Sequence, residues 1–380
     1  ALSALRVEES DRTLIFELSV DAPIGSKILG RPLLYRNKLE LARLTARGER
    51  AKVIIGALED QVELYTKLGF DMMPVALCLA EEYNRPKEVG PNEFTYVDER
   101  TGFYRSVRYQ PESDMMTEYE SQIGEGGLAA LEDYVRRLEE DEFVIDASEL
   151  ESVELARRSV GERMLLVGSV DGTFPVSHAT WLNLFLTCFH TQQALVRRLY
   201  RESTRRAVAT IKALVDAGAE AILGGADWAY DHGPFFSPQQ FRDFILPSLR
   251  EHVDTCHRLG VPFVKHTDGN LKPIERAFLE SGVDGYHAIE PMAGMDIGRL
   301  KREYGDRVCL LGNVDCAMTL VHRSPEETAE ETRGCIEAAS PGGGHVLSSS
   351  NTIHAGVKLE NFLAMLDAHR KYARRVAPGF

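Results

Sequence analysis

The chain of 380 residues is 44% hydrophobic and 27% charged, with a formal net charge of −14. This composition is typical of a globular protein and excludes a disordered, collagenous or coiled-coil chain. The negative charge repels nucleic-acid phosphates and anionic lipid, so neither nucleic acid nor a membrane is expected as a partner. No apolar run reaches the roughly 18 residues of a membrane span, and residues 1–11 lack the apolar core of a signal peptide. None of the six cysteines falls in a CxxC pair, which suits a reducing compartment, and we expect a cytoplasmic protein.

A repeated unit runs through the chain: an amphipathic helical stretch, a glycine suited to the left-handed conformation, and a β-rich run. It recurs at Gly69, Gly218, Gly260, Gly282 and Gly305. Residues 13–18, 164–170 and 345–348 add three candidate strands and bring the number to eight. The strands are continuously apolar, as parallel strands buried on both faces are. The sequence therefore predicts an α/β fold, a (β/α)₈ TIM barrel, as one domain over residues 1–380.

One long segment, residues 81–127, does not fit the repeated unit and is predicted to be an insertion. Apolar or aromatic and polar residues alternate there at Phe103, Arg105, Val107 and Tyr109. This alternation predicts a hairpin lying across the mouth of the barrel. An open doubly wound sheet is the competing architecture, but no GxGxxG or GxxxxGK[ST] follows an early strand to support it.

Polar residues follow nearly every predicted strand. In a TIM barrel the carboxyl ends of the strands meet at one face and carry the reactive groups. Clustered carboxylates that lose their water are costly unless a ligand satisfies them, so this ring predicts a polar ligand pocket. Its members are Glu17, Asp171, Asp227, Asp231, His232, His266, Asp268, Glu290, Asn313, Asp315, Ser349, Ser350, Asn351 and His354.

The most specific local feature is VKHTDGN, residues 264–270. His266 and Asp268 are two residues apart on a predicted strand and therefore share a face. They could be two ligands of a divalent metal, with Glu290 as the third. Alternatively, the carboxylate could orient the imidazole for proton transfer. A purely structural role also stays open, with Asp268 capping the next helix and His266 making hydrogen bonds in the core.

Other candidates follow the neighbouring strands. Asp227 can reach the barrel mouth, whereas Trp228 and the aromatic residues after it either floor a pocket or pack the loop. Asn313 could hydrogen-bond a ligand, and Asp315 could do so or cap the next helix. No G-x-S-x-G elbow surrounds the late serines, so a hydrolase triad is not predicted. Histidines in helical stretches are interpreted as surface or packing residues: His178, His190, His252, His257, His322 and His369.

A longer set of segments supports a family resemblance. From about residue 160 to the C-terminus the chain carries, in this order, ADWAYDHGPFFSPQQFRDFILPSLREHV, HTDGN, GVDGYHAIEPMAGMDIGRLKREYGDRVCLLGNVD, SPGGGHVLSSS and LENFLAML. Together they resemble the uroporphyrinogen decarboxylase superfamily, which includes cobamide-dependent methyltransferases. The resemblance implies a (β/α)₈ barrel, a homodimer and an active-site cleft at the carboxyl ends of the strands.

The resemblance implies two competing activities. True decarboxylases hold the acidic side chains of the porphyrinogen with an early Gly- and Arg-rich signature, where this chain has IFELSVDAPIGSK. They also carry a late Gly-His-Gly turn, where this chain has SSSNTIHAG. Without those cationic contacts, an acidic pocket disfavours a polycarboxylated macrocycle.

The methyltransferase branch is the nearer one. There a zinc ion is held by a His-x-Cys pair and a later cysteine, and it activates a thiol. This chain matches the histidine with His266 but has Asp268 in place of the first cysteine. Its late segment offers Ser349, Ser350 and Asn351 in place of the second. A hard carboxylate in place of a soft thiolate weakens a zinc site.

The resulting hypothesis is a corrinoid-dependent methyltransferase. It would transfer the methyl group of a small methylated molecule, for example a methoxylated one, to the cobalamin of a separate protein. His266 and Asp268 would assist the leaving oxygen as acid or as metal ligands, with Asp227 and Glu290 as catalytic residues that position the substrate. The predicted substrate-binding residues are Glu17, Trp228, Asn313, Asp315, Asn351 and His354.

Two alternatives remain. A decarboxylase or other lyase would use the same pocket on a smaller acid without a corrinoid. A non-catalytic corrinoid- or tetrapyrrole-binding module would keep the barrel and lack the chemistry.

Overall fold

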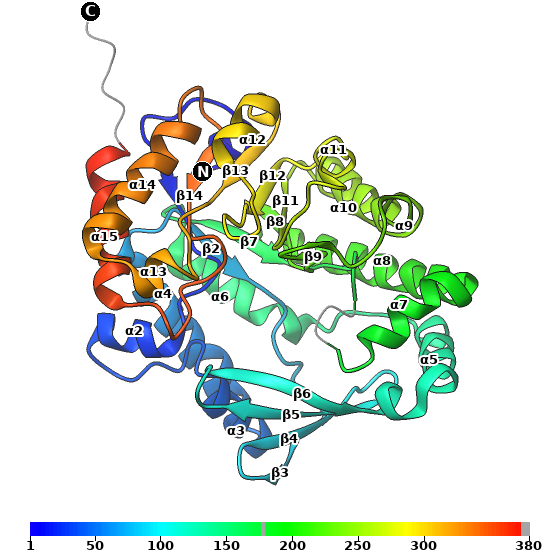
Figure 1. The fold of residues 1–380 in the computed structure, drawn as a ribbon. Coiled ribbons are helices and arrows are strands. Elements are labelled where there is room, and N and C mark those ends of the chain that lie inside the picture. Colours follow the sequence, from blue (N-terminus) through cyan, green and yellow to red (C-terminus); the bar gives the residue numbers. More distant parts are fainter. Residues whose placement is uncertain (176–178, 374–380) are drawn as a thin grey trace, which may run out of the picture.

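A computed structural model of the chain describes residues 1–175 and 179–373. Eight parallel strands form a nearly closed barrel with helices outside it (Figure 1), which confirms the predicted TIM-barrel class. All eight predicted strands are present. They are β1 (Leu14–Ile15), β2 (Met72–Val75), β7 (Leu165–Ser169), β8 (Ala221–Gly224), β11 (Phe263–Thr267), β12 (Gly285–Ala288), β13 (Cys309–Leu311) and β14 (His345–Leu347).

The strands are hydrogen-bonded in the order β1-β14-β13-β12-β11-β8-β7-β2. The remaining seam, between β1 and β2, is bridged by Asp71. Its backbone N–H donates to the carbonyl of Ile15 at 2.9 Å, and its carboxylate accepts the N–H of Ile15 at 2.8 Å. The same carboxylate pairs with Arg12. A side chain thus replaces one backbone acceptor where the two strands would otherwise leave a donor unsatisfied.

The helices surround the barrel and fill the connections. They are α1 (Leu2–Leu5), α2 (Ala22–Leu29), α3 (Lys38–Arg47), α4 (Ala57–Leu68), α5 (Gln122–Glu140), α6 (Glu151–Val160), α7 (Leu182–Thr191), α8 (Gln193–Asp216), α9 (Pro238–Gln240), α10 (Leu246–Arg258), α11 (Glu275–Leu279), α12 (Ile297–Tyr304), α13 (Thr319–His322), α14 (Pro325–Ala339) and α15 (Leu359–Tyr372). A short ribbon of β9 (Ala229–Tyr230) and β10 (Gly233–Pro234) follows β8. Five of the six histidines predicted in helical stretches lie in helices, and the sixth, His178, lies outside the described residues.

The glycine joints between helix and strand are mostly as predicted. Gly69, Gly218, Gly260 and Gly282 all have positive φ, the region that favours glycine. Gly305 is the exception, because it ends α12 with a φ of −71°. The helix is turned into β13 there without a left-handed residue.

Alternation along the strands divides the core into two parts. Residues that point inward fill the barrel, among them Met72, Val167, Leu223, Val264 and Leu311. A larger apolar cluster lies between the strands and the surrounding helices. The inside of the barrel is therefore packed below its mouth, and a ligand has access only at an end of the barrel.

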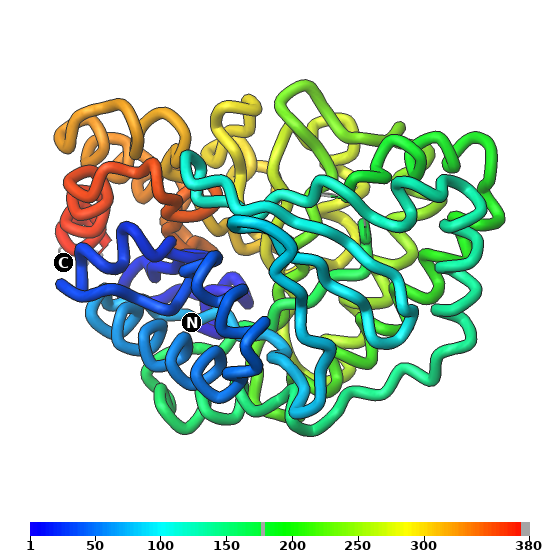
Figure 2. The backbone as a smooth tube through the Cα atoms, turned by 90° about the horizontal axis from the view of Figure 1, so that it is seen from below, coloured from blue at the N-terminus to red at the C-terminus, as the bar shows by residue number. Residues whose placement is uncertain are grey.

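The insertion is larger than the predicted hairpin. It forms a four-stranded antiparallel sheet of β3 (Lys87–Gly90), β4 (Glu93–Val97), β5 (Tyr104–Gln110) and β6 (Met115–Ser121), here called the cover sheet. The predicted alternation lies in β5, whose Val107 is buried with Phe94 and with Ala42 of α3. The prediction missed β3 and β4 because Pro91 and Asn92 interrupt a short, polar segment. Figure 2 shows the cyan cover sheet passing in front of the green and yellow half of the barrel.

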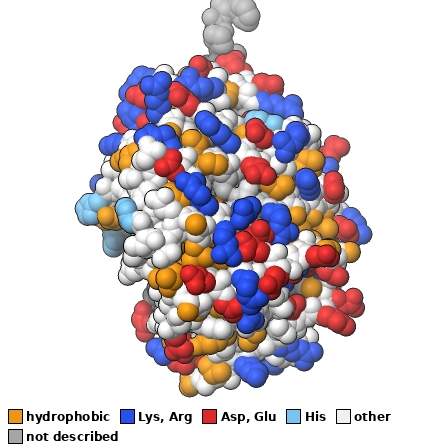
Figure 3. Space-filling view, turned by 90° about the vertical axis from the view of Figure 1, so that its right-hand side faces the viewer, with side chains coloured by type: hydrophobic (Ala, Val, Ile, Leu, Met, Phe, Trp, Pro, Cys, Tyr) orange, Lys and Arg blue, Asp and Glu red, His pale blue; other side chains and the backbone are white. Residues whose placement is uncertain are grey.

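The outer face around α7, α8 and α9 carries mixed charge. Figure 3 shows Lys and Arg side chains interspersed with Asp and Glu on this side of the molecule. In α8, for example, Arg198 pairs with Glu139 and Arg206 with Asp141. Within the described part of the chain, no helix is both long and apolar enough to cross a membrane.

The seam between β1 and β2 gives a stability prediction. We expect Asp71→Ala to lower the free energy of unfolding by about 1–3 kcal/mol, because the N–H of Ile15 loses its acceptor. Asp367→Ala removes an exposed carboxylate of α15 that pairs only with Arg370 of the same helix turn, and should change stability by less than about 0.5 kcal/mol. Denaturant unfolding of both variants measures the difference. Equal stabilities would show that Asp71 does not hold the seam.

Candidate active site

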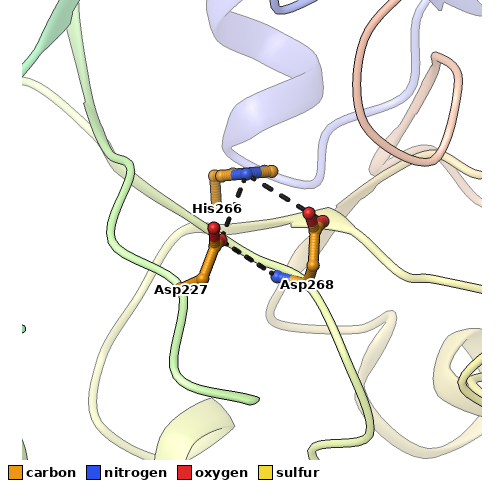
Figure 4. Close-up of side chains that lie close together, drawn as sticks. All are labelled: Asp227, His266 and Asp268. Carbon is orange, nitrogen blue, oxygen red and sulfur yellow. Dashed lines mark hydrogen bonds and ion pairs between the residues drawn. The ribbon is translucent and has the colours of Figure 1, made fainter. Parts of the chain in front are cut away.

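Three side chains converge at the carboxyl ends of β8 and β11. Asp227 lies in the loop after β8, His266 in β11, and Asp268 directly after β11. His266 Nε2 is 3.5 Å from Asp227 Oδ1 and 3.9 Å from Asp268 Oδ1 (Figure 4). The backbone N–H of Asp268 also donates to Asp227 Oδ1 at 3.3 Å. One ligand atom from each side chain lies within 4.8 Å of the others, which makes this Asp-His-Asp cluster a candidate divalent-cation site.

The cluster is poorly hydrated. The exposed fraction of the side chain is 5% for His266 and about 20% for each aspartate. Burial lowers the pKa of His266 to about 4, against the opposing effect of Asp227, so the imidazole is neutral at pH 7. Burial and the charges of Asp227 and Glu290 raise the pKa of Asp268 well above its ordinary value. Such a cluster is stable only with a proton or a cation among its carboxylates.

Asp268 has one occupied and one open oxygen. Its Oδ2 accepts a hydrogen bond from the side-chain amide of Asn351. Its Oδ1, which faces His266, is buried and has no hydrogen-bond partner among the described residues. A buried carboxylate oxygen without a donor is unusual and indicates the place of a missing ligand.

A second histidine supports the first. β11 and β12 pair His266 with His287, and the two Nδ1 atoms are 2.8 Å apart. Because one of them must donate and the other accept, His287 restricts His266 to one ring orientation and one tautomer at a time. His287 is not among the residues that the sequence predicted for the site.

Two cavities lie at the barrel mouth, and their linings reach sequence neighbours of the site residues. The first, of about 760 Å³, lies between the cover sheet, α3 and the ends of β7 and β8, and its lining includes Ala226, the residue before Asp227. The second, of about 740 Å³, lies at the ends of β1 and β2 and reaches Thr352, the residue after Asn351. Leu41 and Ser169 line both cavities.

The predicted third metal ligand, Glu290, does not belong to the cluster. Its Oε2 accepts the backbone N–H of Gly269 at 2.8 Å, which ties it to the turn that follows β11. Burial raises the pKa of Glu290. Asp227, which the sequence analysis assigned to substrate positioning, takes the place predicted for Glu290.

Two predicted substrate-binding residues are buried away from any ligand. Trp228 is fully buried, packs edge-on against Phe241 and Phe278, and donates its indole N–H to Thr173. Its large apolar ring belongs to the core between the strands and the surrounding helices. Glu17 is fully buried as well, and its carboxylate accepts both the N–H and the hydroxyl of Ser349. Both predictions are corrected by this burial.

Three more predicted contacts are engaged in internal hydrogen bonds. Asn313 donates to the carbonyl of Ile289. Asp315 accepts the N–H groups of Ala317 and Met318 in the turn before α13, and the N-cap of that helix is Met318, not the predicted Asp315. For His354 the partners are the carbonyl of Cys316 and the N–H of Gly356. Of the six predicted substrate-binding residues, Asn351 is the one that touches the cluster.

A family model described as uroporphyrinogen decarboxylase (URO-D) matches residues 123–372, about two thirds of the chain. The chain belongs to the URO-D family. The curated relatives include both kinds of enzyme that the resemblance implied. One is a uroporphyrinogen decarboxylase of Thioalkalivibrio sulfidiphilus, 30% identical over 42% of this chain and 44% of that protein. Another is the methylcobamide:CoM methyltransferase MtaA of Methanosarcina barkeri, 27% identical over 59% of this chain and 63% of that protein. The chain spans about half the length of the curated relatives it matches.

Among solved structures, a methyltransferase from Methanosarcina mazei superposes with a TM-score of 0.67 at 20% identity, covering 98% of this chain and 97% of that one. At this identity the likeness concerns the fold. The shared fold extends over nearly the whole chain.

The burial of Glu17 gives a pH-dependent prediction. Burial raises its pKa to about 8, so the folded protein keeps a proton that the unfolded chain releases above about pH 4.5. Stability should therefore fall by up to roughly 1.4 kcal/mol per pH unit between these two values. Glu17→Gln removes this loss, and the variant should be more stable than the wild type near pH 8 and little different near pH 4.5. Urea unfolding at both pH values is the measurement. A difference between the two proteins that does not vary with pH would contradict it.

Proposed function

We propose that the protein is a methyltransferase that moves a methyl group between a small methylated substrate and a corrinoid protein, with the Asp-His-Asp cluster as its reactive centre. The observation that carries the proposal is the cluster itself: a neutral histidine and two largely buried carboxylates, one with an oxygen that no described residue hydrogen-bonds. The similarity to the methylcobamide:CoM methyltransferase supports the reaction type.

The chemistry of the donors fits a divalent cation. Two carboxylates and one imidazole suit borderline and hard ions such as zinc or manganese, and the open Oδ1 of Asp268 supplies a free ligand atom. Asp227, His266 and Asp268 would hold the ion. When bound, such an ion supplies Lewis acidity toward an oxygen of the substrate.

The thiol chemistry implied by the resemblance is not supported. All six cysteines are free thiols, yet none belongs to the cluster. Ser349 and Asn351, in the segment where the second cysteine would stand, bind Glu17 and Asp268. Cys316 follows Asp315 in the sequence, and burial raises the pKa of its thiol to about 12. We therefore place the reaction on the demethylation side, where the substrate gives its methyl group to cobalt.

Acid assistance is what demethylation of an ether requires. The O–CH₃ bond breaks, the electron pair of Co(I) forms the new bond to carbon, and the departing oxygen takes a proton or binds an acid. Asp268 is suited to this task without a cation as well, because burial and the charges of Asp227 and Glu290 raise its pKa and so favour the protonated form. Neutral His266 holds the second carboxylate, Asp227, beside it. The corrinoid protein is the second substrate and would approach through the mouth.

One observation favours the second candidate, decarboxylation of a small acid. Lys38 and Arg105 line the larger cavity, so its wall is not uniformly acidic. Lys38 is already paired with Asp21, whereas Arg105 lies over the ring of Tyr96. A carboxylated substrate could use Arg105. The decarboxylase relatives keep this alternative in view.

Metal content tests the composition of the cluster. We expect the purified protein to hold one equivalent of a divalent metal, and Asp227→Asn, His266→Ala and Asp268→Asn each to lose it, because each removes one ligand. Glu290→Gln is the matched control and should keep the metal, since it removes a carboxylate that only touches Gly269. Elemental analysis after dialysis is the measurement. Loss of metal in the Glu290 variant and not in the Asp227 variant would return Glu290 to the ligand set.

Methyl transfer tests the reaction. Purified protein mixed with reduced corrinoid protein and a panel of methoxylated aromatics, methylamines and methanol should produce methyl-cobalt, seen by its absorbance. His266→Ala and Asp268→Asn should slow the reaction roughly 10²- to 10⁴-fold, the contribution of a positioned acid. A parallel incubation with a porphyrinogen measures carbon dioxide. Carbon dioxide release with no methylation from any donor would show that the decarboxylase alternative is correct.

A further inference from the structure

The residues of the cluster come from a strand and from a loop. His266 lies in β11 and Asp268 follows it directly, whereas Asp227 lies in a connecting loop. We propose that Lys265 and Thr267, the two neighbours of His266 in β11, are positioning residues that fix Asp227 against His266. The inference deepens the proposed function, since it explains how this cluster is assembled.

Both peptide groups next to Asp227 are held by side chains of β11. The peptide before it is held at the carbonyl of Ala226, which accepts a hydrogen bond from Lys265 Nζ at 2.7 Å. The peptide after it is held at the N–H of Trp228, which donates to Thr267 Oγ1 at 2.9 Å. Peptide groups are planar, so two fixed planes leave the backbone angles of Asp227, and hence the direction of its side chain, little freedom.

The hold on Ala226 has two sides. Lys265 is fully buried and pairs with Asp171 Oδ2 at 2.5 Å, and this same oxygen accepts the N–H of Ala226 at 3.1 Å. The two residues of the ion pair thus hydrogen-bond both the N–H and the carbonyl of Ala226. Asp171 is itself held through its other oxygen, which accepts the N–H of Thr173 at 2.5 Å.

The ion pair is better explained by geometry than by stability. Removing a lysine and an aspartate from water costs several kcal/mol per ion, and apolar residues of similar size are often at least as stabilising. In exchange for this desolvation, the ion pair makes directed hydrogen bonds to Ala226 in the loop. The ammonium group of Lys265 also lies 4.4 Å over the ring of Trp228. A buried apolar pair would leave the polar groups of Ala226 unsatisfied.

Alternation along β11 makes the arrangement possible. Successive side chains of a strand point to opposite faces, so Lys265 and Thr267 reach the loop outside the barrel while His266 points into the mouth. The next residue, Asp268, donates its N–H to Asp227 Oδ1. Four consecutive residues therefore supply two members of the cluster and three contacts that place the third.

Thr267→Val is the mildest test, because valine has the shape of threonine and lacks the acceptor. We expect the affinity for Co²⁺ to fall roughly 10- to 100-fold, as for other residues that orient a metal ligand, and the visible spectrum of bound Co²⁺ to change. The matched control is Thr332→Val, which removes a buried hydroxyl of α14 that bonds only to the carbonyl of Thr328. It should bind Co²⁺ as the wild type does, at a similar cost in stability.

Lys265 needs a paired design, since Lys265→Met leaves Asp171 buried without its cation. Lys265→Met combined with Asp171→Asn removes both charges and keeps an acceptor for the N–H of Ala226. We expect the double variant to recover stability relative to the single one, measured by denaturant unfolding. Its affinity for Co²⁺ should stay reduced, because the carbonyl of Ala226 is still unheld. A role confined to stability would restore both properties together.

Crystal structures of the Thr267→Val and double variants read the position of Asp227 directly. Displacement of its carboxylate from the N–H of Asp268 supports the inference. Wild-type affinity for Co²⁺ with Asp227 in place, in both variants, overturns it. If the wild type itself takes up no Co²⁺, the proposed metal site fails, and the structures alone then decide: an unmoved Asp227 overturns the inference and a displaced one supports it.

Discussion

Alternation of side chains along β11 is the constraint on which the site depends. A strand in a barrel presents one residue to the interior and the next to the helices. In the segment from Lys265 to Asp268 this places a histidine at the mouth between two residues that bind the loop after β8. A shift of one residue in the register of β11 would turn Lys265 into the barrel and His266 toward α10. The parallel pairing with β8 and β12 on either side prevents that shift.

Desolvation then gives the cluster its chemical character. Two carboxylates within hydrogen-bonding range of one imidazole would be ordinary at a wet surface. Here the side chain of His266 is only 5% exposed, and burial lowers the pKa of His266 while it raises the pKa of Asp268. The barrel cannot satisfy Asp268 Oδ1 from its own residues. A buried carboxylate oxygen without a hydrogen-bond donor indicates the place of a missing ligand, and the kind of ligand follows from the ligand atoms around it.

The sequence predicted the fold well because each of its signals is local and repeated. Eight apolar strands, five of them preceded by an amphipathic helix and a glycine, predict a barrel, and alternation over residues 103–109 found β5 of the cover sheet. It could not predict the strands around Asn92, where polar residues pair only because α3 supplies an apolar surface beneath Phe94 and Val107. At the site, strand-end position correctly selected Asp227, His266, Asp268 and Asn351 as neighbours.

Position at a strand end does not say which way a side chain turns or what else can bind it. Glu290 and Asp315 lie at the predicted ends, but the carboxylate of Glu290 accepts the N–H of Gly269 in the turn after β11, and that of Asp315 accepts the N–H of Ala317 in its own turn. Lys265 was overlooked because a charged residue within an apolar strand gives no periodic signal of its own. The lysine in FVKHT is nevertheless informative: a charge that must be buried needs a partner from another strand, and the partner available at a strand end is Asp171. That pairing brings the ends of β7, β8 and β11 together. Lys265, the residue that the sequence pattern explains least, is therefore the one that joins Asp227 to β11.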